Sequence, residues 1–370
     1  MARRADEVER RRLNDLFVEL CGIESPSGRE APCAARVRAE LDGLGLAVES
    51  DGAGNVFARI AGASDAALML CAHLDTVTLQ APVEPVLVEN GWENANDGIL
   101  GADNKAAVAM LLALAHRCVA EPPPIGLELL FTVSEEVGLV GAQAFDTGAL
   151  HSAFGYVFDH ATPIGEIVLA GPTYYRLEAE FHGAAAHAGI RPEQGRSAIA
   201  AAAQAVAAMR LGRLDEETTA NVGRIAGGGD STNVVPDRCR IEAEARSLDA
   251  AKAEAVVAEM GDRVHDGANA TECDVDVTVE RLWTAYRLRP STPAVAVAEA
   301  ALRACGYGPR QIVTGGGSDA NAFNAAGFSC VNLANGTERN HEPGERVSVA
   351  ALEGMLDVTF ALVEEAAAAC

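Results

Sequence analysis

The chain has 370 residues, of which 49% are hydrophobic, so it is long enough to form more than one domain with a substantial apolar core. Its 53 acidic and 29 basic residues give a formal net charge of -24, which repels nucleic acid phosphates and anionic lipid headgroups. We therefore expect a soluble globular protein that binds neither nucleic acid nor a membrane.

The N-terminal segment and the cysteines indicate a cytoplasmic protein. The segment MARRADEVERRRL is charged throughout and lacks the apolar stretch of a signal peptide, and no later run is long enough to span a membrane. The nine cysteines are scattered without the paired spacings of a zinc ribbon or a redox motif, so buried free thiols are expected. Cys71 is expected to fill apolar space rather than to act as a nucleophile.

The first 170 residues alternate helical and strand patterns, which predicts an α/β domain with a central sheet flanked by helices. The expected elements are helices up to about Leu20 and over 29–43 and 103–118, and strands near 46–50, 55–60, 67–72, 126–133 and 154–159.

From about Gly171 the order of elements changes to strand, helix, two strands, helix and strand. This βαββαβ order is the ferredoxin-like arrangement and predicts a compact inserted domain. Its expected elements are strands at 173–182, 219–226, 238–247 and 272–281 and helices at 195–210 and 250–265. After Pro290 the α/β pattern resumes, with helices to Cys305, from Ser318 and from Ser348, and strands at 311–314 and 328–333. We expect a catalytic domain of residues 1–170 and 286–370, interrupted by an inserted domain over 171–285.

Two polar residues follow the strand near 67–72. His73 and Asp75, in CAHLDTV, are two residues apart and share a face if the strand continues. The carboxylate could then hold the imidazole in one tautomer, as metal-binding histidines usually require. The alternative is an ordinary polar pair at the end of a strand.

Asp103 lies where a glycine-containing loop meets a helix, in LGADNKAAVAMLL. An aspartate there can be an N-cap that satisfies exposed amides and favours the helix dipole. It can equally be a carboxylate that bridges two cations, and the spacing fits both.

Glu135 and Glu136, in FTVSEEVGLVGA, stand where an apolar strand ends and glycines begin. Inside a continuing strand their side chains would point to opposite faces, but a turn lets both reach one site from two sides. Asp159 closes another apolar strand, where the alternative is a simple turn residue.

These residues follow strand and loop ends, and the C-terminal edge of an α/β sheet is where such proteins build sites. Imidazole and carboxylate ligands without cysteine suit zinc, with manganese or cobalt as alternatives. One more histidine would complete two metal sites, and the loop ANGTERNHEP supplies His341.

An ordered set of motifs covers essentially the whole chain: CAHLDTV, LGADNKAAVAMLL, FTVSEEVGLVGA, FDH, GAAAHAG, GGGSDANAF and NLANGTERNHEP. Together they resemble the dinuclear zinc peptidases that include peptidase T, bacterial glutamate carboxypeptidase, dipeptidases and aminoacylases, with peptidase T-like enzymes the most similar. The resemblance implies two Zn²⁺ per subunit. It implies that His73 and Asp159 bind one ion, that Glu136 and His341 bind the other, and that Asp103 bridges them.

The same resemblance implies two catalytic roles beside the metals. Asp75 would orient His73. Glu135 would be the general base, taking a proton from the metal-held water and delivering it to the leaving amine. A base must stay free of the metals, which fits Glu135 if Glu136 is a ligand.

The inserted domain resembles the lid and dimerisation domain of that family, which implies a homodimer. His187, in GAAAHAG, would reach the partner's active site and stabilise the tetrahedral oxyanion. Asn233 would lie near the reacting carbonyl, and Arg246 would grip the substrate carboxylate. Without the resemblance, His187 would more simply be structural and Arg246 part of a surface ion pair.

The glycine turn TGGGSDAN has backbone amides that can meet an anion, although it can also be only a tight turn. We assign Gly316, Gly317 and Ser318 a role in substrate binding. Two features depart from the family: many relatives have aspartate where this chain has Asn104, and LWTAYRLRP matches no family motif, which leaves specificity open.

The expected function is metal-dependent hydrolysis of short peptides by an aminopeptidase or tripeptidase. A carboxypeptidase, a dipeptidase or an N-acyl amino acid deacylase on the same scaffold is the alternative. A non-catalytic relative that binds metabolites is disfavoured, because a binding module does not need a free base beside two metals.

Overall fold

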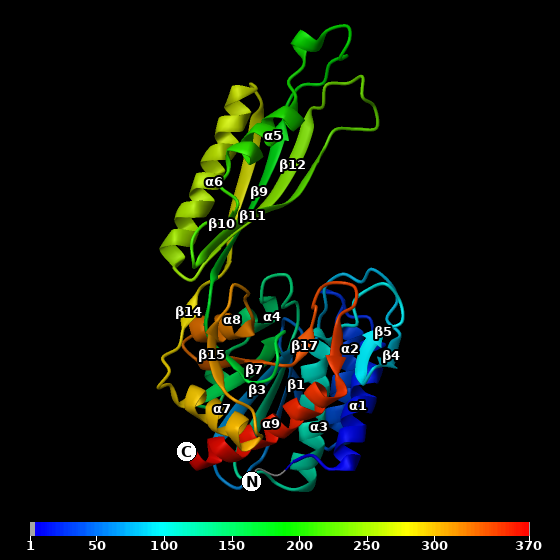
Figure 1. The fold of residues 1–370 in the computed structure, drawn as a ribbon, viewed down its shortest axis with the longest axis vertical. Coiled ribbons are helices and arrows are strands. Elements are labelled where there is room, and N and C mark those ends of the chain that lie inside the picture. Colours follow the sequence, from blue (N-terminus) through cyan, green and yellow to red (C-terminus); the bar gives the residue numbers. More distant parts are fainter. Residues whose placement is uncertain (1–3, 370) are drawn as a thin grey trace. The chain divides into compact units, whose positions relative to one another are not determined.

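The computed structural model describes residues 4–369, which form two compact units (Figure 1). The first unit runs to Ala170 and also contains Arg287–Val313 and the chain from Ser318 onward. The second contains Gly171–Tyr286 together with Thr314–Gly317, so the glycine turn belongs with the inserted segment.

The first unit is built on a nine-stranded mixed sheet in the order β1-β2-β6-β3-β7-β16-β8-β14, with β15 paired to β8. Its strands are β1 (Val48–Ser50), β2 (Val56–Ile60), β3 (Ala67–His73), β6 (Gly126–Thr132), β7 (Phe154–His160), β8 (Glu166–Gly171), β14 (Tyr286–Arg287), β15 (Arg310–Val313) and β16 (Ser329–Ala334). The strands β6, β3, β7 and β16 run parallel to their neighbours in this series, so their C-terminal ends meet at one edge.

Helices cover both faces of this sheet, as the sequence predicts. They are α1 (Glu7–Cys21), α2 (Ala31–Gly43), α3 (Ala102–Ala120), α4 (Val140–Ala144), α7 (Pro293–Ala304), α8 (Asp319–Ala325) and α9 (Val349–Ala369). Leu68 and Leu70 of β3 join the apolar core that α3 also lines, whereas Cys71 points the other way and lies 3.7 Å (Sγ to Oδ2) from Asp319 of α8. The prediction of an α/β unit with a flanked mixed sheet is confirmed.

A small second sheet in the first unit is absent from the sequence-based expectation. It has the order β17-β18-β5-β4 and joins β4 (Pro85–Val88) and β5 (Gly91–Asn94) to β17 (Thr337–Glu338) and β18 (Arg346–Ser348). The loop between β17 and β18 carries His341, so this sheet attaches a late segment of the chain to an early one.

The second unit has the predicted βαββαβ order with one extra two-residue strand. Its elements are β9 (Thr173–His182), α5 (Ala198–Ala208), β10 (Gly212–Arg213), β11 (Thr218–Gly227), β12 (Arg238–Ser247), α6 (Ala250–Ala270) and β13 (Asp274–Trp283). The antiparallel sheet has the order β10-β11-β12-β9-β13, and α5 and α6 pack against it over a core of small apolar side chains. The ferredoxin-like prediction is confirmed.

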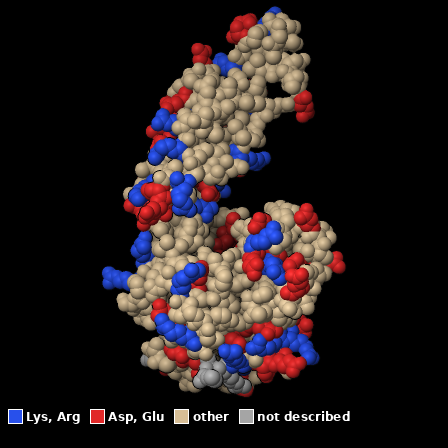
Figure 2. All heavy atoms as spheres, viewed as in Figure 1, with Lys and Arg blue, Asp and Glu red and all other residues tan. Residues whose placement is uncertain are grey.

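Charged side chains of both signs lie on the surface (Figure 2), whereas the cysteine thiols of the described residues are buried. Acidic and basic side chains are interspersed on the face drawn in Figure 2. The eight cysteines among the described residues are free and buried, and burial raises the pKa of Cys71 well above its usual range. Among the helices of residues 4–369, none is long and apolar enough to cross a membrane.

Candidate active site

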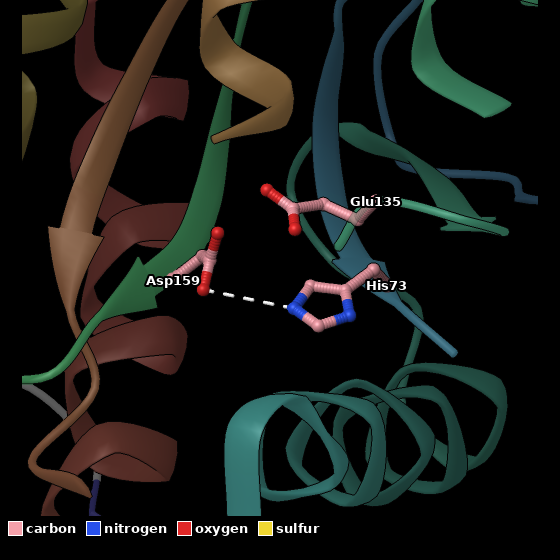
Figure 3. A group of neighbouring side chains, drawn as sticks. All are labelled: His73, Glu135 and Asp159. Atoms are coloured by element: carbon pink, nitrogen blue, oxygen red, sulfur yellow. Dashed lines mark ion pairs between the residues drawn. The ribbon is translucent and has the colours of Figure 1, made fainter. Parts of the chain in front are cut away.

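The polar residues at the strand ends meet at one edge of the large sheet. His73 is the last residue of β3, Glu135 lies three residues after β6, and Asp159 is the next-to-last residue of β7. Their side chains point toward one another (Figure 3), with His73 Nε2 3.7 Å from Asp159 Oδ1. His73 and Glu135 are buried, so the parallel strands gather these groups away from bulk water.

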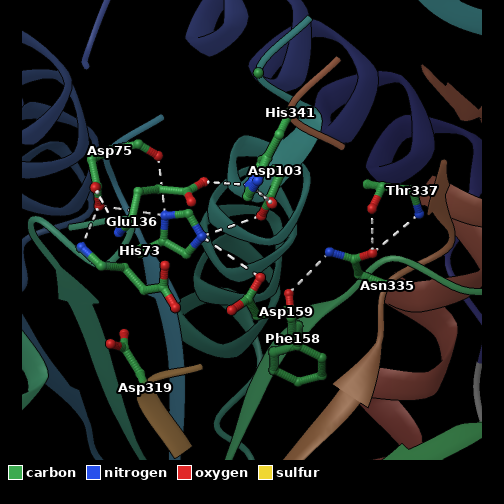
Figure 4. A network of polar contacts seen from close by, with 12 residues as sticks. His73, Asp75, Asp103, Glu136, Phe158, Asp159, Asp319, Asn335, Thr337 and His341 are labelled. Carbon is green, nitrogen blue, oxygen red and sulfur yellow. Dashed lines mark hydrogen bonds and ion pairs between the residues drawn. The ribbon is translucent and has the colours of Figure 1, made fainter. Parts of the chain in front are cut away.

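Asp103 lies at the centre of this group, and each of its carboxylate oxygens lies beside a different histidine. Oδ1 is 3.2 Å from Nε2 of His73, and Oδ2 is 3.1 Å from Nε2 of His341 (Figure 4). Asp103 has non-helical backbone angles at the start of α3. The two histidines come from distant segments of the chain, and the Asp103 carboxylate connects them.

Two groups of ligand atoms share Asp103. His73 and Asp159 lie on the side of Oδ1, while Glu136 Oε1 lies 2.9 Å from His341 Nε2 on the side of Oδ2. Ligand atoms bound about 2.0–2.2 Å from a tetrahedral metal lie roughly 3.3–3.6 Å from one another. The observed separations of 2.9–3.7 Å are close to that spacing, so these donors fit two neighbouring metal ions.

The charge of the group also favours cations. Five carboxylates, those of Asp75, Asp103, Glu135, Glu136 and Asp159, surround two imidazoles, and burial raises the pKa of Glu135, Glu136 and Asp159. Burial opposes charge on Asp103 too, but His341 and His73 outweigh it and lower its pKa. Oε1 of Glu136 is buried and, although it lies beside His341, accepts no well-aligned hydrogen bond from any described residue. Burying more carboxylates than there are cationic partners costs free energy, and bound divalent cations would compensate the excess negative charge.

The carboxylate of Asp75 holds the turn that carries the two glutamates. Its Oδ1 accepts the backbone N–H of Glu135 at 2.9 Å, and its Oδ2 accepts the backbone N–H of Glu136 at 3.1 Å and the hydroxyl of Ser27 at 2.7 Å. The nearest partner of His73 Nδ1 is the backbone carbonyl of Asp75 at 3.0 Å, with the carboxylate Oδ1 at 3.5 Å. Asp75 therefore contacts both the histidine and the glutamate turn.

Other buried side chains fix the backbone around the site. Glu30 accepts hydrogen bonds from the backbone and hydroxyl of Ser134, which has a positive φ of 55° immediately before Glu135. The Asn332 side chain pairs with the backbone N–H and carbonyl of Asp159, at 2.9 Å each. Asn335 donates to the carbonyl of Phe158 at 3.2 Å (Figure 4).

Sequence reasoning missed two buried carboxylates beside this group, Asp319 and Glu345. Asp319 is 1% exposed, and its Oδ2 accepts the Thr132 hydroxyl at 2.5 Å. Burial raises the pKa of Asp319 to about 6, and its charge contributes to the raised pKa of Glu135. Its position directly after the glycine turn and Ser318 was the available signal. Glu345 follows His341 by four residues and contacts the backbone of Asp103.

The glycine turn makes local contacts. The N–H of Gly316 donates to the hydroxyl of Thr314 at 3.0 Å, and Ser318 forms a reciprocal capping box with Asn321 at the start of α8. A Cβ on Gly317 would overlap the indole ring of Trp283. A substrate role for Gly316, Gly317 and Ser318 stays a prediction.

In the second unit, Arg246 on β12 is held by aromatic rings. Its guanidinium lies 4.3 Å from the ring centre of Tyr174 and 5.8 Å from that of Trp283, and Nη2 pairs with Glu244 at 3.0 Å. The guanidinium is thereby oriented before any ligand is bound.

His187 and Asn233 lie together, away from Arg246. Their segments are paired by a bridge between His187 and Val234 and by the Ala188 N–H donating to the Asn233 carbonyl at 2.8 Å. These segments adjoin the Arg238 end of β12, whereas Arg246 is near the other end of this ten-residue strand. At about 3.3 Å per residue, the strand separates the two groups by roughly 25–30 Å.

The chain has similar proteins along its whole length. Residues 171–272 match the peptidase dimerisation domain, and residues 55–164 match peptidase family M28. The uncharacterized protein YqjE of Bacillus subtilis is 36% identical over 97% of this chain and 100% of its own. The structure of the aminopeptidase PepT from Bacillus cereus is 36% identical, covers 96% of this chain and 98% of its own, and superimposes with a TM-score of 0.81. The chain belongs to the peptidase T-like family of dinuclear metallopeptidases.

A second member of this family supports the assignment. The tripeptidase SAV1512 from Staphylococcus aureus is 31% identical over 97% of this chain and 99% of its own, with a TM-score of 0.88. Membership in the peptidase T-like family makes the chain a metal-dependent peptide hydrolase, as the sequence motifs predict.

Proposed function

We propose that the chain is an aminopeptidase or tripeptidase that cleaves short peptides with two zinc ions, with Glu135 as general base. The observation that carries this proposal is Asp103, whose two oxygens lie beside His73 and His341. The resemblance to an aminopeptidase and a tripeptidase over nearly the whole chain supports this substrate class.

The donor set defines where the ions would bind. His73 and Asp159 would hold one ion, Glu136 and His341 the other, and Asp103 would lie between them. When bound, two such ions polarise a scissile carbonyl and lower the pKa of a water molecule. Imidazole and carboxylate donors suit zinc, with cobalt and manganese as alternatives.

Glu135 is suited to move the proton. It is buried beside the ligands, and burial followed by the charge of Asp159 raises its pKa well above the usual range. A general base works best when its pKa approaches the working pH. Its carboxylate would take the proton of the attacking water and deliver it to the leaving amine, while Asp75 holds its backbone N–H.

His187 and Asn233 would complete the site of a second subunit. His187 Nδ1 accepts the N–H of Gly189 at 3.2 Å, which leaves Nε2 as the ring nitrogen that would donate a hydrogen bond to an oxyanion. Arg246 would bind the substrate carboxylate of its own subunit. The match to a dimerisation domain supports a homodimer.

A hydrolysis panel tests the proposal. Free di- and tripeptides, N-blocked and C-amidated peptides, and N-acyl amino acids are incubated with the protein, with chelator and with added Zn²⁺, Co²⁺ or Mn²⁺. We expect cleavage of free tripeptides at the N-terminal bond, loss of activity with chelator and its recovery with metal. Preference for N-blocked substrates would overturn the aminopeptidase assignment, and full activity in chelator after dialysis would overturn the metal requirement.

A further inference from the structure

The carboxylate of Glu345 accepts three backbone hydrogen bonds from the loop that presents Asp103. Oε2 accepts the N–H groups of Leu100 at 2.9 Å and of Gly101 at 2.8 Å, and Oε1 accepts the N–H of Asp103 at 2.8 Å. Glu345 is 1% exposed and lies just before β18. A side chain from the far end of the chain therefore fixes this loop.

These amides need a partner because of the local backbone. Gly101 has a positive φ of 75°, and Asp103 is extended rather than helical, so the N–H groups precede the regular turns of α3. The first amides of a helix have no partner within the helix, and a buried amide left unpaired is costly. An acidic side chain at this end of a helix is also favoured by the helix dipole.

Glu345 thus performs the capping that one of the two interpretations of the sequence gives to Asp103. Among the described residues, the only hydrogen-bond partners of the Asp103 carboxylate are the imidazoles of His73 and His341. A carboxylate occupied by helix amides would have less freedom to bridge two cations. Both oxygens of the Glu345 carboxylate are used as acceptors by these three backbone N–H donors.

We propose that Glu345 is a positioning residue for the metal centre. It holds the 100–103 loop so that Asp103 presents one oxygen to each histidine, and it ties that loop to the segment carrying His341 four residues earlier. The inference rests on the proposed metal-dependent function, because positioning matters only if the two oxygens meet metal ions. Residues that orient metal ligands typically change metal affinity 10- to 100-fold when they are replaced.

The test compares Glu345→Gln and Glu345→Asp with a matched control, Glu128→Gln. Glu128 is also 1% exposed and accepts the N–H groups of His151 and Ser152, but it lies on β6 far from its C-terminal end. The Glu345→Gln change would place an amide donor against backbone donors, while Glu345→Asp keeps the charge with a shorter reach. Metal-free forms of each protein are titrated with Co²⁺ followed by absorption, after circular dichroism has verified folding.

We expect Glu345→Gln to bind Co²⁺ about 10- to 100-fold more weakly than the unchanged protein, with Glu345→Asp between them and Glu128→Gln unchanged. If Glu345→Gln does not fold, the comparison rests on Glu345→Asp. Affinity equal to that of the unchanged protein in the folded Glu345 variant, or an equal loss in Glu128→Gln, would overturn the positioning role. Failure of the unchanged protein itself to bind Co²⁺ would instead overturn the proposed function and this inference with it.

Discussion

Oδ1 of Asp75 accepts the backbone N–H of Glu135 at 2.9 Å. The same carboxylate accepts the N–H of Glu136, and the backbone carbonyl of Asp75 contacts Nδ1 of His73. One residue thus positions a proposed ligand on β3 and the turn after β6.

Replacing Asp75 by asparagine should therefore damage metal binding and turnover together. The asparagine side chain has one acceptor oxygen, whereas both oxygens of the Asp75 carboxylate accept backbone hydrogen bonds. The backbone N–H of either Glu135 or Glu136 would therefore lose its acceptor or face the NH₂ group of the asparagine. We expect kcat and metal affinity each to fall about 10- to 100-fold. Steady-state kinetics and zinc titration of the metal-free protein measure both, and an unchanged metal affinity would contradict the shared role.

Neutral substitutions of the two neighbouring glutamates should have different effects. Glu135→Gln should keep its metal and lose about 10²- to 10⁴-fold in kcat, since it removes only the proton carrier. Glu136→Gln should lower metal occupancy, because it replaces a charged ligand. Metal analysis after gel filtration, paired with kcat at saturating substrate, distinguishes the two. Equal metal loss in both variants would refute the assigned roles.

Gly317→Ala should weaken binding of the substrate carboxylate. The new Cβ would overlap the Trp283 ring, and that ring supports the Arg246 guanidinium. We expect KM for free tripeptides to rise about 10-fold with kcat little changed, because the carboxylate contact stabilises the bound substrate and the transition state equally. Gly315→Ala is the control, because a Cβ there meets nothing within 4 Å. An equal rise in KM for C-amidated peptides would argue against the carboxylate contact.

Mixing two impaired variants should restore activity, measured at substrate concentrations well below KM. The proposed function assigns His187 to the partner subunit's site, and His187 and Arg246 lie near opposite ends of β12. We therefore expect each site of a homodimer to combine Arg246 of one subunit with His187 of the other. A mixture of His187→Ala and Arg246→Ala subunits, unfolded and refolded together, should recover about one quarter of the normal activity. Random pairing makes half of the dimers mixed, and each mixed dimer has one intact site and one site that carries both substitutions. Activity no higher than that of either variant alone would show that both residues serve the same subunit's site.

The buried carboxylate of Glu128 should stabilise the fold at neutral pH and lose this contribution in acid. Burial opposes its ionisation, but the His151 and Ser152 hydrogen bonds outweigh burial and lower its pKa from the ordinary value of 4.5. A carboxyl with a lowered folded-state pKa stabilises the fold above its unfolded pKa and loses that contribution as pH falls through the folded pKa. The gap in unfolding free energy between the unchanged protein and Glu128→Gln should therefore narrow below about pH 4.5. Urea unfolding from about pH 7 to about pH 3.5 measures it, and a constant gap would contradict the assignment.

Local patterns predicted the large elements well because these elements are long and strongly apolar. The strand over Ala67–His73 and the order of the inserted domain follow from patterns within short windows. The sheet of β4, β5, β17 and β18 was not predicted. Each of these strands has four residues or fewer, and two of the four, β17 and β18, come from a segment more than 200 residues later in the sequence than β4 and β5. Short, partly exposed strands leave little periodic signal.

The candidate site shows the same division between local and distant information. Spacing placed His73, Glu135 and Asp159 at strand ends, and parallel pairing brings strand ends to one edge. Spacing left Asp103 as either a helix cap or a bridge, because the side chain that accepts the amides at this helix end is Glu345, which no nearby residue reveals. The link from Asp75 to the Glu135 amide was missed for the same reason, since sequence spacing relates Asp75 only to His73.

The positions of His341 and Glu345 in the sequence bear on when the proposed metal site can form during synthesis. A ribosome makes the chain from its N-terminus, and domains begin to fold as they emerge. His73, Asp103, Glu135, Glu136 and Asp159 are all made before the inserted domain, whereas His341 and Glu345 follow it in the sequence. The proposed metal site therefore lacks one histidine, and the loop of Asp103 lacks its acceptor, until the ribosome has made the inserted domain. In that order of assembly, the first segment of the chain cannot complete the site before the inserted domain has been synthesised.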